Sequence, residues 1–390
     1  MSILSLNIFL FTIFGVWKPA HWKSTPTIWI YNAYTVIITL MLHFLTFTQC
    51  MDVLLLVNDI DEFTANCFML ISILGVCWKA VIVLIKRQEI IRLMDSLLEE
   101  PCKPRDDHEA AIFAQFETFI RTYTKRYSFL TTMSVTGVTI RSILSVADGS
   151  LPFRVWLPYS TPPHSFVFWL TAFQQIIATV YAAYISVGTE TLIFGLILHT
   201  CSQIEILKHR LQQLTVAFEK YHNNVELLPY ELQMKVKDGL SRCVDYHIVI
   251  FEYAEDLNSV FSPVLFVQFS GSVIILCCSI FQISALKPAS MEFLGLLVYT
   301  ICMLAQIFLY CWSGNEVMLK CGEVSDAVYA IDWTILGVSE RRMLLVIMKR
   351  SMTPIKFTSS FLVSLTINSY TSILKATYSA FNVLQQSMNK

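Results

Sequence analysis

A stripe of polar side chains runs along the apolar segment from residue 357 to residue 386. The segment is long enough to cross a bilayer as a helix. Seven of its polar side chains recur at intervals of three and four residues: Ser364, Asn368, Thr371, Lys375, Ser379, Asn382 and Gln386. Residues at these intervals share one face of an α-helix. The spacing therefore predicts a membrane helix with one continuous polar face.

Such a face has two possible environments, because polar groups exposed to lipid are costly. It packs against another helix through small hydroxyl residues, or it borders water. Asn, Gln and Lys are too large for close packing of small residues, which favours water as much as packing. One subunit offers only one such helix, so a water-filled pore requires several subunits around a common axis. The predicted pore residues are Ser379, Asn382, Val383 and Gln386.

Two members of this segment set conditions on the pore hypothesis. Val383 lies where the polarity thins near the outer end, and it is a candidate for a gate that closes by dewetting. A ring of Lys375 ammonium groups would repel cations. Lys375 therefore turns toward a neighbouring helix, or the other subunits lack it, or the pore does not conduct cations.

The composition places the chain among membrane proteins. Of 390 residues, 55% are hydrophobic and 15% are charged, and the mean hydropathy is +0.57. A soluble domain carries about 25% charged residues. The apolar blocks predict an all-α protein with one seven-helix domain over residues 1–390, and no linker or repeat divides it. The predicted spans are 28–51, 63–85, 127–147, 166–199, 257–285, 293–315 and 357–386.

The distribution of basic residues predicts the orientation. Of the 28 Lys and Arg, 22 fall on the side of the N-terminus and 3 on the other side, with Lys79, Arg141 and Lys375 inside spans. The positive-inside rule places the N-terminus in the cytoplasm and the C-terminus outside the cell. A G-protein-coupled receptor has the opposite orientation. The apolar segment 3–17 lacks the features of a signal peptide, and it is expected to lie as a helix on the membrane surface.

Several polar positions leave alternatives open. Lys79 and Arg141 lie within about two turns of a span end, so snorkelling to the interface is favoured over a cavity. Cys50 and Cys67 flank the first outer loop and could form a disulfide, which needs a geometry that sequence does not supply. The eleven Cys show no metal-binding spacing, and no metal is expected.

Amphipathic patterns continue two spans into the cytoplasm. Ile204, Leu207, Leu211, Leu214 and Phe218 follow the fourth span, and Leu232, Val236, Leu240, Val244 and Ile248 precede the fifth. The two helices are expected to form an anchor bundle, packed within the subunit or between subunits. A break at Pro229 separates them.

Other function classes have little support in the sequence. It contains no HExxH, G-x-S-x-G, G-x-G-x-x-G or P-loop motif, so no enzyme and no cofactor is expected. The cytoplasmic charges are nearly balanced, which indicates no nucleic-acid partner. A transporter remains an alternative, although inverted repeats and spans broken by Gly or Pro are not evident.

Four stretches of the chain resemble the insect odorant receptors. They are TSILKATYSAFNVLQQ at residues 371–386, YCWSGNEV at 310–317, DAVYAIDW at 326–333 and RSMTPIKFT at 350–358. Thr377 stands where many members have Ser. Gustatory receptors are a related group, but their ending pattern fits less well because Gln385 is followed by Gln386.

The resemblance implies a function, partners and a location. Members form tetrameric, odorant-gated, non-selective cation channels in the plasma membrane of olfactory sensory neurons. The last helix of each subunit lines the pore, and most members assemble with a shared odorant co-receptor (Orco). The co-receptor has a much longer loop between the fourth and fifth spans. This chain is therefore expected to be the odorant-binding, tuning subunit.

The resemblance also implies an odorant pocket in the outer half of the membrane, among spans two, three, four and six. Depth and face place these residues in that zone: Phe68, Met69, Ser72, Thr136, Gly137, Ile140, Phe173, Ile177, Tyr181, Tyr299 and Met303. Apolar walls with a few hydroxyl groups suit a volatile, weakly polar ligand. Tyr181 and Tyr299 are the strongest candidates, because a buried phenol needs a hydrogen-bond partner.

Overall fold

The computed structural model describes residues 4–18, 24–55, 60–222, 230–288, 290–331, 333, 336–360 and 363–388. These residues form α-helices and one short β-hairpin. The elements are α1 (Ser5–Ile13), α2 (Thr25–Leu55), α3 (Ile60–Ile85), α4 (Arg87–Ser96), α5 (Asp107–Ala147), α6 (Phe166–His222), α7 (Tyr230–Ala285), α8 (Met291–Tyr329), α9 (Val338–Ser351), β1 (Thr358–Ser359), β2 (Val363–Ser364) and α10 (Ile367–Met388).

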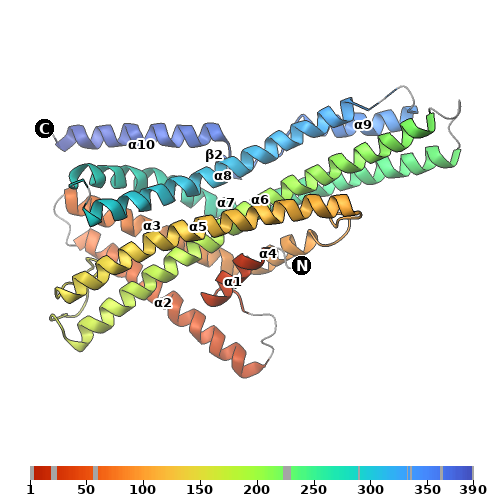
Figure 1. The fold of residues 1–390 in the computed structure, drawn as a ribbon. Coiled ribbons are helices and arrows are strands. Elements are labelled where there is room, and N and C mark those ends of the chain that lie inside the picture. Colours follow the sequence, from red (N-terminus) through yellow and green to blue (C-terminus); the bar gives the residue numbers. More distant parts are fainter. Residues whose placement is uncertain are drawn as a thin grey trace.

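The long helices lie side by side in an elongated bundle, and α6 crosses its centre (Figure 1). Most of α6 is buried, because α1, α2, α3, α5, α7 and α8 all contact it. Helix α10 lies along one edge of the bundle. Its C-terminal end points to the end of the molecule opposite α9 (Figure 1). One face of α10 is therefore free of the rest of the subunit.

Six described helices are long and apolar enough to cross a membrane. Their apolar stretches lie in α2, α3, α5, α6, α7 and α8, which contain the first six predicted spans. The seventh span corresponds to α10, which is more polar and has 22 residues. At 1.5 Å per residue that helix is roughly 33 Å long, enough to cross the hydrocarbon core. The seven-helix fold predicted from the sequence is confirmed.

The predicted start of the last span at residue 357 is wrong, because α10 begins ten residues later. Strand β1 pairs antiparallel with β2, which contains Ser364, so this residue does not belong to the helical stripe. The backbone turns at Ser360, whose φ is 47°. Two side chains of α7 hold the hairpin: Asn258 Oδ1 accepts from the Thr358 amide at 2.8 Å, and Ser262 Oγ accepts from the Ser360 amide at 2.6 Å.

The amphipathic extensions of α6 and α7 pack against each other within the subunit. Leu207, Leu211 and Leu240 are all buried, and a Cβ at Gly239 would lie 2.6 Å from Leu214. Ile248, however, is exposed, so its place in the predicted apolar stripe is wrong. A strict spacing of four residues advances about 40° beyond a full turn at each step. Residues at that spacing therefore rotate gradually away from the buried face of the helix. Pro229, the predicted break, lies outside the described residues.

Helix α1 packs on α6 with one face and leaves another exposed. The Asn7 side chain is buried and donates to Thr191 Oγ1 at 2.6 Å. Phe11 approaches Gly188 so closely that a Cβ there would lie 2.8 Å from its ring. Phe9 and Ile13 remain exposed. The arrangement suits a helix that lies between the bundle and the membrane surface, with part of its predicted apolar face covered by protein.

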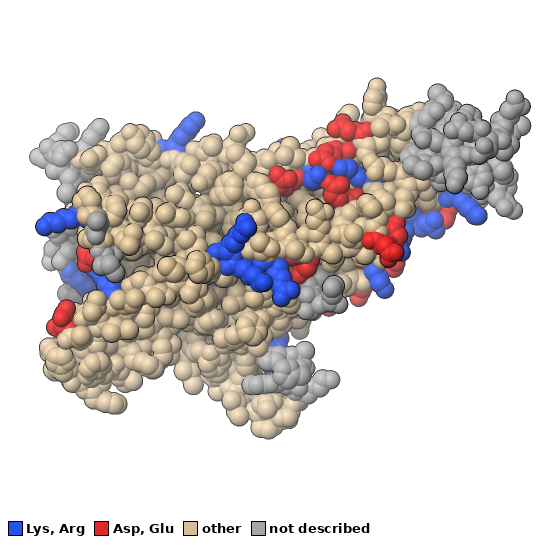
Figure 2. Space-filling model, viewed as in Figure 1, with Lys and Arg blue, Asp and Glu red and all other residues tan. Residues whose placement is uncertain are grey.

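Charged residues gather on the half of the molecule toward α9, and few lie over the opposite half (Figure 2). The charged half is the cytoplasmic end under the positive-inside rule. Arg141 lies near the other end of α5, where its guanidinium pairs with Glu292 at 3.0 Å and both side chains are exposed. This position agrees with the predicted snorkelling of Arg141.

Candidate functional site

The polar stripe of α10 lies on the side of the helix that the subunit leaves exposed. Asn368, Thr371, Lys375 and Ser379 are exposed, and Asn382 is half-buried. Val383, the predicted gate residue, is 67% exposed. The backbone of Gln386 belongs to α10, but its side chain lies outside the described residues. A single subunit therefore offers this polar face to water, to lipid or to another subunit.

The opposite side of α10 is fixed to the bundle. Ile373 and Thr377 are buried, and the Tyr370 ring meets Phe308 of α8 edge-on at a centroid distance of 5.6 Å. Ahead of the helix, Leu365 lies so close to Gly314 that a Cβ on Gly314 would be 2.5 Å from it. Any larger residue at position 314 would push the start of α10 away from α8.

Three of the predicted pocket residues come together between α3 and α8. The Ser72 and Tyr299 hydroxyl groups are 2.5 Å apart, and the Phe68 ring meets the Tyr299 ring at 5.7 Å. Met303 is buried one turn further along α8, and Met69 packs at the edge of the core. This cluster combines apolar walls with a pair of hydroxyl groups that can exchange hydrogen bonds.

Tyr181 lies on the α1 and α2 side of α6, apart from the Ser72–Tyr299 contact. Its ring is buried and packs 6.3 Å from Phe14, between α1 and α2 in the chain. The hydroxyl makes no standard hydrogen bond with the described residues, although Thr39 is near enough to interact with it. A ligand hydroxyl or carbonyl group could complete its hydrogen bonding.

The other predicted pocket residues lie nearer the surface of the subunit. Phe173 is 58% exposed and Ile140 is 45% exposed, and Thr136 is exposed as well. Ile177 is half-buried, and a Cβ built at Gly137 would meet nothing within 4 Å. No hydrogen bond or ring contact among the described residues joins them to the Ser72–Tyr299 cluster.

An ionic network that the sequence analysis missed lies among the membrane spans. Lys79 of α3 is buried and pairs with Glu190 of α6 at 2.6 Å, so snorkelling of Lys79 is wrong. Ser186 hydrogen-bonds both groups, and the Tyr127 hydroxyl of α5 donates to the second Glu190 oxygen. Glu190 gave a signal in the sequence, because it is an acid deep inside the fourth span. Only the fold shows that it faces Lys79.

A hollow of about 340 Å³ lies under the outer loop between α5 and α6, lined by Gly149, Leu151, Phe153, Arg154, Val155, Thr161 and Phe168. The Gln175 side chain ties this loop to α6, accepting from the Phe153 amide at 3.1 Å.

Cys50 and Cys67 are free thiols, so the structure does not contain the disulfide considered for them. Among the described residues, no group of acids, His and Cys is placed to hold a metal ion.

Comparison with known proteins identifies the class. The described helices form a multi-pass membrane protein, and the family model described as 7tm Odorant receptor matches residues 59–378. Odorant receptor 10 of Aedes albopictus is 24% identical over 303 residues, which is 73% of each chain. Odorant receptor 46a, isoform B, of Drosophila melanogaster is 20% identical over 97% of both chains. The chain belongs to the insect odorant receptor family.

Solved structures show the same fold. The insect olfactory receptor OR5 from Machilis hrabei in complex with eugenol superposes with a TM-score of 0.82, covering 98% of this chain and 97% of that receptor at 15% identity. A second structure of OR5 gives a TM-score of 0.78 at 16% identity. At this identity the likeness shows the fold alone.

Proposed function

We propose that this chain is the odorant-binding subunit of a heteromeric, odorant-gated, non-selective cation channel in the plasma membrane of olfactory sensory neurons. A volatile odorant binds in the outer half of the helix bundle, and binding opens a pore to which each subunit contributes its last helix. The partner subunit is the odorant co-receptor, Orco. No enzymatic step is needed for this function.

The observation that carries the proposal is the exposure of the α10 stripe. Asn368, Thr371 and Ser379 are polar, and they lie on the exposed side of a helix long enough to span the membrane. The Thr371 hydroxyl already donates to the Asn368 carbonyl oxygen at 2.9 Å, but in lipid the Asn368 amide and the Ser379 hydroxyl would have no solvent to hydrogen-bond. An assembly that turns α10 toward a central axis gives them water, while Ile373 and Thr377 keep the helix fixed to its own subunit.

The Ser72–Tyr299 cluster supports the ligand site. It offers a hydroxyl pair beside the Phe68 ring, which suits a small ligand with one polar group. The related receptor OR5 binds eugenol, a small phenol, within the same fold. The remaining predicted pocket residues, including Tyr181, stay predictions, and they would contribute if the bundle rearranges around the ligand.

The chain length between α6 and α7 supports the tuning role. Helix α6 ends at His222 and α7 begins at Tyr230, so the segment that connects them is too short to contain a long insertion of the co-receptor type. The shortness of this connection separates the chain from a co-receptor, which carries a much longer loop there.

Co-expression with a co-receptor tests the proposal. We expect odorant-evoked currents that persist when G-protein signalling is blocked, and no such currents from the co-receptor alone. Absence of current across a broad odorant panel, with both subunits present at the cell surface, would contradict the proposal.

Replacing Ser379 or Val383 should change ion permeation and leave the rank order of odorants unaltered. A change in odorant rank order alone would show that these residues do not line the pore.

A further inference from the structure

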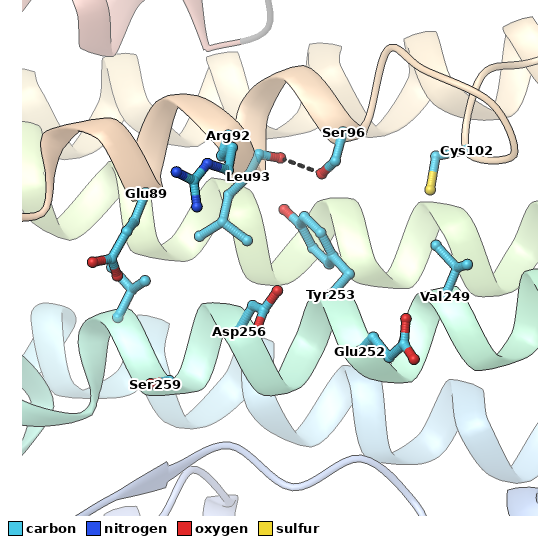
Figure 3. A pocket seen from close by; sticks show the side chains of 11 residues that line it. Glu89, Arg92, Leu93, Ser96, Cys102, Val249, Glu252, Tyr253, Asp256 and Ser259 are labelled. Carbon is cyan, nitrogen blue, oxygen red and sulfur yellow. Dashed lines mark hydrogen bonds between the residues drawn. The ribbon is translucent and has the colours of Figure 1, made fainter.

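A groove of about 360 Å³ lies between α4 and α7, on the cytoplasmic side of the bundle. Eleven residues line it: Glu89, Arg92, Leu93, Ser96, Cys102, Val249, Glu252, Tyr253, Asp256, Ser259 and Val260. In Figure 3, Glu89 and Arg92 extend from α4 along one wall, and Glu252 and Asp256 extend from α7 along the other. The groove is within the size range of small-molecule sites.

The groove lies at the level of the inner membrane surface. Helix α3 ends at Ile85, and Lys86, between α3 and α4, donates to the Ser259 carbonyl oxygen at 3.5 Å. The fifth span was predicted to begin at residue 257, next to Asp256. A molecule in this groove is therefore level with the lipid headgroups, with Val260 toward the membrane and Val249 toward the cytoplasm.

Charged side chains of both signs face the groove, and one of them has an ion-pair partner. Glu89 pairs with Lys86 at 3.4 Å. No ion pair is found for Arg92, Glu252 or Asp256 among the residues that the structure describes. Burial raises the pKa of the Cys102 thiol to about 11, so at neutral pH it adds no charge. One guanidinium and two carboxylates are left to recognise a ligand.

The floor of the groove carries a polar group with unused hydrogen-bonding capacity. Tyr253 is 6% exposed, and its hydroxyl has no hydrogen-bond partner among the described residues. Its ring crosses the groove with the hydroxyl toward α4, beside Ser96 (Figure 3). The Ser96 hydroxyl itself donates to the Leu93 carbonyl oxygen at 3.0 Å. A buried phenol without a partner is costly, and a ligand oxygen that accepts a hydrogen bond from the hydroxyl group would remove that cost.

We propose that this groove binds the phosphoethanolamine headgroup of a lipid in the inner leaflet. The phosphate accepts hydrogen bonds from the Arg92 guanidinium and the Tyr253 hydroxyl, because guanidinium groups match phosphate oxygens in charge and geometry. The primary ammonium donates to Glu252 and Asp256, which are four residues apart on α7 and roughly 6 Å from each other. Leu93, Val249 and Val260 cover the carbon atoms.

The charge balance decides among headgroups. Phosphatidylserine adds a carboxylate, which the two unpaired acids would repel. Phosphatidylcholine has no N–H group to donate to them. Phosphatidylethanolamine has a phosphate group for Arg92 of α4 and an ammonium group for the two acids of α7.

The test uses the full-length protein in phosphatidylcholine nanodiscs, with native mass spectrometry to count retained lipids. We expect added phosphatidylethanolamine to be retained about tenfold more strongly than added phosphatidylcholine. Arg92→Gln and Asp256→Asn should each reduce this ratio to about one. Asp95→Asn, an exposed acid of α4 that does not line the groove, should leave it unchanged. Circular dichroism checks that each variant is folded.

Three results would overturn the inference. They are equal retention of the two lipids, a preference that survives both groove variants, and an equal loss of preference with Asp95→Asn. Soluble O-phosphoethanolamine distinguishes a lipid from a free headgroup. It should displace the lipid only at far higher concentration, whereas equal affinity would contradict a lipid ligand. None of these measurements depends on channel current, so the result is independent of the proposed function.

Discussion

Glu190 and Ser379 are both polar residues of membrane helices, but the subunit treats them in opposite ways. Glu190 is buried among α3, α5 and α6, with hydrogen bonds from Lys79, Ser186 and Tyr127. Ser379 lies on the exposed side of α10. The first group completes its interactions within one chain, whereas the second has to find water or another subunit.

The difference separates polarity that stabilises the fold from polarity available for function. A buried ion pair contributes little net free energy, but removal of one partner leaves an uncompensated charge. An exposed stripe can be changed with little effect on folding. Variants in the two regions should therefore affect different measurements, and the predictions below begin with the largest expected effect.

The largest effect is expected at the buried ion pair. Lys79→Met removes the ion-pair partner of the buried Glu190 carboxyl group, which should cost about 3–5 kcal/mol of stability and abolish surface delivery. Surface biotinylation and the thermal unfolding midpoint measure this loss. The double variant Lys79→Met with Glu190→Gln should recover most of the delivery, because no charge is left buried. Normal delivery of the single variant would show that the pair is not buried in the membrane protein.

A smaller effect is expected at Lys375, and on permeation alone. A unit charge 4 Å from a passing ion contributes about 1 kcal/mol in water, so Lys375→Gln should raise cation conductance by up to roughly fivefold. Single-channel recording measures the change. Surface delivery should stay normal, because the side chain is exposed. Unchanged conductance and reversal potential would mean that Lys375 faces away from the pore.

The hydroxyl pair should affect ligand sensitivity. Tyr299→Phe removes a hydrogen bond worth about 0.5–1.5 kcal/mol, which should raise the odorant concentration for half-maximal current by roughly two- to tenfold. The reversal potential should not move. Tyr329→Phe is the matched control, because Tyr329 is 77% exposed at the far end of the same helix and is not among the predicted pocket residues. An equal shift in both variants would argue against a ligand at Tyr299.

A small effect on stability is expected in the cytoplasmic half, at the N-cap of α5. The Glu109 backbone amide donates to Asp106 and is the main cause that lowers the pKa of this carboxyl group to about 2. A lowered folded-state pKa stabilises the protein above the unfolded value near 4, and this stability is lost as the pH falls toward 2. Asp106→Ala should cost about 1 kcal/mol at pH 7. Equal unfolding midpoints at pH 7 would contradict the cap.

Sequence patterns predicted the fold well where periodicity and charge dominate. The first six spans follow from apolar runs, and the structure contains a long apolar helix at each of them. The cytoplasmic bundle follows from amphipathic spacing, and the extensions of α6 and α7 form it as expected. The β-hairpin before α10 was missed, because its stability comes from Asn258 and Ser262 on a distant helix. Hydropathy alone does not distinguish such a hairpin from the first turns of a span.

The site was predicted less completely, because side-chain partners depend on how helices rotate in the bundle. Phe68, Ser72 and Tyr299 were placed by depth and meet in the structure, whereas Phe173 and Ile140 had suitable depth but lie on exposed faces. Lys79 and Glu190 are opposite charges within predicted spans two and four, which was a usable sign of pairing even though Lys79 lies near the end of its span. A single sequence does not show which two helices face each other.

Cysteine accessibility on α10 tests the central claim most directly. Ser379→Cys and Thr377→Cys place a thiol on the exposed and on the buried side of the same helix, two residues apart. With the odorant co-receptor present and the odorant applied, a water-soluble thiol reagent should reduce the current of Ser379→Cys. It should not affect Thr377→Cys or the unsubstituted channel. If Ser379→Cys resists the reagent with and without odorant, or if both variants respond equally, α10 does not line the pore.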